Sequence, residues 1–183
     1  MYFDKPGKEN SEETLRLALD TARQRGIENI VIASSSGETA EFFKGVDDVN
    51  VTCVTLAYGS PIAGENQMKD EKRKELEKEG IKVLTATHTL SGAERCLSIK
   101  FGGISPVEVM ANTLRIFGQG MKVAVEIATM AMDAGCIPYG KQVISIGGTS
   151  EGVDTAIIIR AEYSRSILDT KVDEIICKPI LEK

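Results

Sequence analysis

Apolar and polar residues follow one another along this chain with the spacing of alternating helices and strands. The first helix is predicted over residues 11–25, where apolar side chains recur at positions i, i+3, i+4 and i+7 and Gly26 follows the last turn. Further elements are predicted, in chain order, as a strand at 29–34, a helix at 38–44, a strand at 49–58, a helix at 69–79 and a strand at 81–87. This rhythm is typical of a parallel sheet covered by helices on both faces.

Three helices come next without a strand between them, over residues 91–100, 105–117 and 121–134. The first begins with the capping-box pattern Ser91-Gly-Ala-Glu94, and the second with Ser105-Pro-Val-Glu108, which has proline at the first helical position. The polar residues of the third helix form one narrow stripe on an otherwise apolar surface. They are Lys122, Glu126, Thr129 and Asp133. We therefore expect this helix to be buried on most of its sides.

The last part of the chain returns to strands. Two apolar runs, at 141–148 and 155–161, have only six residues between them, which is too few for a parallel crossover. These two strands are therefore predicted to pair antiparallel. Residues 172–180 form a last strand or an edge segment. We find no internal repeat and no linker, so we predict one three-layer α/β domain over residues 1–183.

Composition narrows the classes of partner. The 183 residues carry 22 basic and 27 acidic side chains, a formal net charge of −5, and the basic residues of 69–79 are interleaved with acidic ones. A nucleic acid or a membrane is therefore not expected as a partner. There is no apolar run of about 18 residues and no apolar segment typical of a signal peptide, so we expect a cytoplasmic protein. The four cysteines have the spacing of neither a metal site nor a disulfide framework.

The stretch IVIASSSGETAEFF, residues 30–43, carries the first candidate site. A strand ends there in three serines and a glycine, and a helix is predicted to follow. One interpretation is an ordinary turn, since serine and glycine are common turn and cap residues. The other is an anion site, in which hydroxyls and the unpaired N–H groups of a helix start bind a phosphate. This stretch alone leaves both interpretations open.

Similar loops follow other predicted strands. In an open α/β sheet the ligand lies outside the carboxyl ends of the strands, where the strand order reverses. The first loop supplies Ser34, Ser35, Ser36, Gly37 and Thr39, a later loop supplies Gly147, Gly148, Thr149, Ser150 and Gly152, and His88 follows the third strand. If the first and last of these loops are neighbours, they form a two-sided phosphate-binding site, which we call the cradle.

Four further residues have two interpretations each. His88 either ends its strand with a backbone hydrogen bond or faces a ligand. Glu94 is expected to cap its own helix, and Arg95 is a surface residue or a phosphate ligand. For Glu126 we expect a position facing solvent or in a salt bridge, the alternative being a carboxylate that faces the cleft.

Several motifs together resemble a known family. The segments TLRLALDTARQRGIENIVIASSSGETAEF and KQVISIGGTSEGVDTAIIIR resemble the C-terminal domain of pyruvate kinase, in which a serine- and threonine-rich turn binds the effector phosphate. The whole chain is similar to stand-alone, archaeal-type proteins with the pyruvate kinase alpha/beta domain. The motifs that carry this likeness are KPGKEN, EETLRLAL, ASSSGETA, THTLSGAERC, VAVEIATMAMDAG, GGTSEGVDTAIIIR and EIICKP.

The resemblance implies a mixed, mostly parallel five-stranded sheet in the order 3-2-1-4-5, with strand 5 antiparallel. It also implies a phosphorylated small-molecule ligand, flavin mononucleotide (FMN) first, with Asn10 near the cleft, and we expect a homo-oligomer. Because the catalytic barrel of pyruvate kinase has no counterpart in these residues, we expect no pyruvate kinase activity. The alternatives are a regulatory or assembly module without chemistry of its own, and a flavin-dependent enzyme that uses His88.

Overall fold

The computed structural model describes residues 1–181 of the chain. Its α-helices are α1 (Ser11–Arg25), α2 (Asp70–Lys78), α3 (Ala93–Phe101), α4 (Pro106–Arg115) and α5 (Gln119–Asp133), and its short 3-10 helices are η1 (Lys8–Asn10), η2 (Thr39–Phe43) and η3 (Ser164–Asp169). Its strands are β1 (Tyr2–Phe3), β2 (Asn29–Ala33), β3 (Asn50–Val54), β4 (Lys82–Leu84), β5 (Val143–Gly147), β6 (Thr155–Arg160) and β7 (Lys171–Pro179).

All seven of these strands form one mixed sheet in the order β1-β7-β6-β5-β2-β3-β4. Strands β5, β2, β3 and β4 are parallel to one another, whereas β6 is antiparallel to both β5 and β7. In the centre of the sheet Ile30 pairs with Ile144, and Ile32 pairs with Ile146. The carboxyl ends of β2 and β5 therefore lie side by side.

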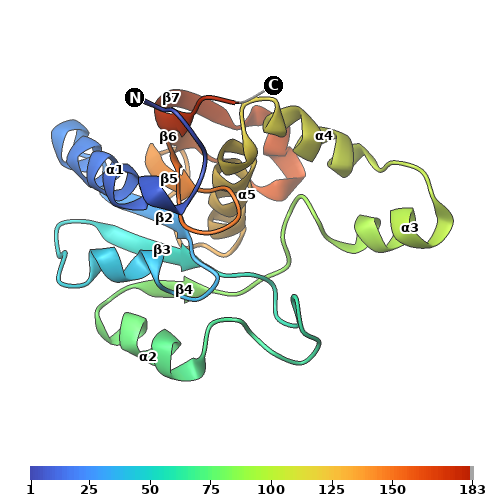
Figure 1. Cartoon of the computed structure of the whole chain (residues 1–183), viewed down its shortest axis with the longest axis horizontal. Coiled ribbons are helices and arrows are strands. Elements are labelled where there is room, and N and C mark those ends of the chain that lie inside the picture. Colours follow the sequence, from blue (N-terminus) through green and yellow to red (C-terminus); the bar gives the residue numbers. More distant parts are fainter. Residues whose placement is uncertain (182–183) are drawn as a thin grey trace.

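Helices cover both faces of the sheet, so the domain has three layers (Figure 1). The strand sequence sorts its side chains between the two faces, because successive residues of a strand point to opposite sides. Ile30 and Ile32 of β2 join the core beneath α1, while Val31 between them joins the core beneath α5. Both faces are buried, which explains why β2, β5 and β6 are almost continuously apolar.

The five-stranded sheet that the resemblance implies was wrong in number, because β7 and β1 extend the sheet to seven strands within the described residues. Strand β7 confirms the last strand predicted at 172–180. The five predicted strands do lie in the expected order, and β5 and β6 pair antiparallel as predicted. The segment expected as a helix at 38–44 is a single 3-10 turn, and β3 ends at Val54 instead of residue 58. None of the helices described is long and apolar enough to cross a membrane.

Of the two predicted capping boxes, the one at α4 forms as expected and the one at α3 is shifted by one residue. At α4, Ser105 and Glu108 form the complete capping box, with proline at the first helical turn. At α3 the N-cap is Gly92 instead of Ser91, and the Glu94 carboxylate accepts from the Gly92 N–H at 2.6 Å. The expected capping role of Glu94 is therefore confirmed at a shifted position. Helices α3 and α4 extend away from the sheet beside its carboxyl edge (Figure 1).

Candidate functional site

A cleft of about 1460 Å³ lies at the carboxyl edge of the parallel strands. Its walls come from the loop after β2, the β5–β6 loop, the segments after β3 and β4, the first turn of α1, and helices α3, α4 and α5. Eight of the predicted ligand-binding residues line it. They are Ser34, Ser35, Ser36, Thr39, His88, Gly148, Ser150 and Gly152. The two loops of the predicted cradle are neighbours because β2 and β5 are paired.

The loop after β2 is held by its own hydroxyl groups. Ser34 Oγ accepts from the Gly37 N–H at 3.1 Å, and Ser36 Oγ accepts from the Glu38 N–H at 3.4 Å. The Thr39 hydroxyl instead donates to the Ala33 carbonyl at 3.0 Å. These contacts are those of a serine-stabilised turn. They leave the hydroxyl protons of Ser34 and Ser36 free to be donated, so the turn and the anion site are compatible.

The β5–β6 loop is fixed against the start of α1. Gly152 has a φ of 72°, and a side chain there would collide with Ser11 and Lys8. The Ser11 hydroxyl accepts from the Val153 N–H at 3.0 Å. Ser150 lies in the left-handed region with a φ of 62°, which is uncommon for a residue other than glycine. These contacts fix the conformation of the β5–β6 loop at the rim of the cleft.

Four predicted residues do not line the cleft. Gly37 is buried, and a Cβ atom there would meet Lys72 of α2, so its role is to allow the turn. Gly147 faces α5, and Thr149 lies outside the cleft lining. The Asn10 amide donates to the Lys5 carbonyl at 2.8 Å and so stabilises the preceding turn. Glu151, in the same loop as Thr149, does line the cleft.

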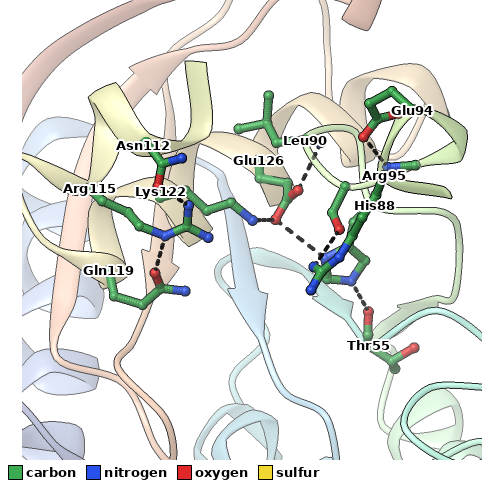
Figure 2. A network of polar contacts seen from close by, with 12 residues as sticks. Thr55, His88, Leu90, Glu94, Arg95, Asn112, Arg115, Gln119, Lys122 and Glu126 are labelled. Carbon is green, nitrogen blue, oxygen red and sulfur yellow. Dashed lines mark hydrogen bonds and ion pairs between the residues drawn. The ribbon is translucent and has the colours of Figure 1, made fainter. Parts of the chain in front are cut away.

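A buried charge network forms the back of the cleft (Figure 2). Glu126 of α5 is 1% exposed and accepts from the Leu90 N–H at 2.9 Å. Its other carboxylate oxygen contacts Lys122 Nζ, one helical turn earlier, and His88 Nδ1 at 3.3 Å. The expected salt bridge of Glu126 is confirmed, but the expectation that it faces solvent was wrong. Of the polar stripe of α5, Lys122 and Glu126 face the cleft.

The contacts of His88 favour its doubly protonated form. Nε2 lies 3.2 Å from the Thr55 carbonyl, and Nδ1 lies beside the Glu126 carboxylate; a carbonyl and a carboxylate can only accept. The hydrogen bond to Glu126 is the main reason that the pKa of His88 is raised above 6.5. Burial alone would raise the pKa of Glu126, but His88 and Lys122 outweigh burial and lower that pKa. With both nitrogens of His88 protonated, the network holds two cations and one anion.

We expect the imidazole of His88 to titrate above pH 6.5, with a midpoint set by Glu126. His88 is the only histidine of the chain, so a single ring resonance in an NMR titration reports it. Because the folded-state pKa is raised, protonation of His88 stabilises the fold. This contribution is complete below about pH 6.5 and is lost as the pH rises through the folded-state pKa.

The matched variant for this titration is Glu126→Gln, which keeps the size of the side chain but removes its charge. It should shift the midpoint of His88 downward. A midpoint at or below 6.5 in the unmodified protein would show that the imidazole does not hold both protons in the way the contacts require.

Sequence reasoning missed three cleft residues: Arg115, Gln119 and Lys122. Arg115 Nε donates to Gln119 Oε1 at 2.7 Å, and Arg115 Nη1 donates to Asn112 Oδ1 at 3.0 Å (Figure 2). A usable signal was present for Lys122, because a lysine and a glutamate one turn apart on an otherwise apolar helix predict a buried ion pair. Arg95 lines the cleft but is exposed, and its guanidinium donates to Ser91 Oγ at 3.2 Å.

The open sheet, with a cleft where the strand order reverses, has the architecture of a doubly wound α/β domain. A family model for "Pyruvate kinase, alpha/beta domain" matches residues 12–159. The chain therefore belongs to the pyruvate kinase alpha/beta domain family.

Two solved structures of pyruvate kinase from Cryptosporidium parvum are similar to this chain. One, in complex with ADP, is 17% identical over 87% of the chain, and the other is 16% identical over 83%; both have a TM-score of 0.45. The matched region is 25% and 23% of those proteins, so the chain spans about a quarter of their length.

Proposed function

We propose that the cleft binds a phosphorylated small molecule, with its phosphate between the loop after β2 and the β5–β6 loop. The observation that supports this most is the pairing of β2 with β5, which brings the hydroxyl residues of one loop beside Gly148 and Gly152 of the other. Ser34 and Ser36 keep hydroxyl protons to donate. Backbone N–H groups and hydroxyls in this arrangement suit a phosphate, and glycine lets it approach the backbone.

The ligand that we propose first is FMN. A flavin needs a polar site for its phosphate and an apolar wall for its flat ring. The cleft offers such a wall in Val54, Leu56, Leu90, Val123 and Ile127, and its volume is ample for a molecule of this size. When bound, FMN would supply hydride and electron transfer, and His88 would face it as an imidazolium.

Two measurements test this proposal. Denaturation of purified protein should release a phosphorylated compound that mass spectrometry identifies, and FMN added to ligand-free protein should bind with quenching of flavin fluorescence. Ser36→Ala should weaken this binding about tenfold or more, because a hydrogen bond to a charged acceptor is lost.

The control for this variant is Ser164→Ala, an exposed serine of η3 outside the cleft, which should bind FMN with unchanged affinity. If Ser36→Ala also leaves the affinity unchanged, the phosphate does not lie on the loop after β2.

A second candidate function is assembly, with another copy of this chain as the partner. The segment of α3, α4 and the turns after them exposes seven large apolar side chains by 52% to 77%. They are Leu97, Ile99, Phe101, Ile104, Val109, Ile116 and Phe117. Apolar surface of this extent commonly marks an interaction site. Analytical ultracentrifugation separates the candidates: colourless protein that sediments as an oligomer favours assembly, and a ligand-bearing monomer favours ligand binding alone.

A further inference from the structure

Lys122 is a buried cation with unused hydrogen-bond donors. Its side chain is 7% exposed and lines the cleft from the first turns of α5. An ammonium group has three N–H donors. Within residues 1–181 the Lys122 ammonium has one hydrogen-bond partner, the Glu126 carboxylate. A buried ammonium that opens onto a cleft with unused donors is prepared to bind an acceptor.

The net charge of the network around Lys122 also favours binding of an anion. Lys122 and an imidazolium at His88 carry two positive charges, and Glu126 carries one negative charge. The excess positive charge lies in a mostly buried position, where an uncompensated charge is costly. Glu94 and Glu108 also line the cleft, where they accept from the Gly92 N–H and, at 2.8 Å, from the Ser105 N–H, but among the described residues neither forms an ion pair with the network. An anionic ligand beside Lys122 would balance the charge of the network.

Arg115 adds a second cation at the same corner of the cleft. Its contacts are with the neutral amides of Gln119 and Asn112, and among the described residues it forms no ion pair. These amides orient the guanidinium without neutralising it. Figure 2 shows the Arg115 and Lys122 side chains extending from neighbouring helices toward the same side. Helix α5 begins here at Gln119, with no side-chain cap and no acidic residue in its first turn, and Gln119 and Lys122 line the cleft.

We propose that Arg115 and Lys122, on either side of the start of α5, form an oxyanion subsite, separate from the cradle, that binds a carboxylate or phosphate group of a small acidic molecule. This rests on the proposed function in one respect: the acidic molecule would lie in the cleft beside the phosphorylated ligand. A planar guanidinium with two forward N–H groups and a neighbouring ammonium suits an oxyanion with two acceptor oxygens.

The test is isothermal titration of the full chain with malonate and, separately, with inorganic phosphate. Each titration is done on ligand-free protein and again on protein saturated with FMN. Arg115→Gln and Lys122→Met should each weaken binding of the preferred anion at least tenfold. Arg25→Gln, an exposed arginine of α1 outside the cleft, controls for the loss of one charge. Its affinity for the anion should stay within about twofold of that of the unmodified protein, because charged groups far apart in salt interact weakly.

The outcomes separate this subsite from the cradle. Preference for malonate identifies a carboxylate ligand, and preference for phosphate identifies a phosphorylated one. Anion binding that persists in FMN-saturated protein supports a separate subsite, whereas competition with FMN overturns it. Unchanged affinity in Arg115→Gln overturns it as well, and this exposed residue can be replaced without disturbing the buried pair. If FMN fails to bind at all, the proposal of FMN as the ligand fails, and titration of ligand-free protein still decides on the subsite.

Discussion

Replacing Glu126 with leucine is expected to lower the free energy of unfolding by about 3–5 kcal/mol. The carboxylate is 1% exposed and accepts hydrogen bonds from Lys122, His88 and the Leu90 N–H. Leucine has a similar volume and accepts none of these bonds. The Lys122 ammonium would remain buried without its counter-ion, and the Leu90 N–H would lose its acceptor. Urea denaturation followed by circular dichroism measures the loss.

Two variants show whether charge, rather than shape, causes the loss. Glu126→Gln keeps an acceptor for the Leu90 N–H and should cost clearly less than Glu126→Leu. The double variant Glu126→Leu/Lys122→Met removes both charges of the pair and should regain part of the stability, because an apolar pair can replace a buried ion pair. If Glu126→Leu alone lies within about 1 kcal/mol of the unmodified protein, the network does not hold α5 to the sheet edge.

The arrangement of strands was largely predictable because a buried strand has a recognisable apolar pattern in the sequence. Strands covered on both faces, such as β2 and β6, are continuous apolar runs, and the short connection to β6 permits only antiparallel pairing. Strand β1 has two residues, too few for any pattern, and it exists because its backbone pairs with β7. Pairing between the two ends of a chain is not encoded in local periodicity.

The candidate site was predictable to the level of loops but not of side chains. Topology places the ends of β2 and β5 together, so every residue of both loops was a candidate for ligand binding. The direction of each side chain then separates them: Ser36 lines the cleft, whereas Gly37, next in sequence, faces α2. Similarly, the stripe on α5 was visible as a pattern. Periodicity gives the faces of a helix, and only packing decides that Glu126 faces His88 and not water.

The second large effect is expected from Gly147→Ala, which should destabilise the fold by about 3 kcal/mol through overpacking. Gly147 ends β5 where α5 crosses closest to the sheet. A methyl group there would collide with the Gly120 carbonyl oxygen, lie 2.8 Å from Ala124 N and lie 3.0 Å from Val123 Cβ. Two of these atoms belong to the helix backbone, which cannot rotate away as a side chain can. The whole start of α5 would have to move.

Gly92→Ala is the matched control for this variant. A methyl group at Gly92 would lie 3.1 Å from the end of the Glu94 side chain, which can yield, and at ordinary contact distance, 3.5 Å and 3.7 Å, from Thr87 and the His88 carbonyl oxygen. Its cost should stay within about 0.5 kcal/mol. Because Gly147→Ala displaces the first turn of α5, it should also weaken oxyanion binding at Arg115 and Lys122, whereas Gly92→Ala should not. Equal unfolding free energies for the two variants would contradict close helix–sheet packing as the reason for glycine at position 147.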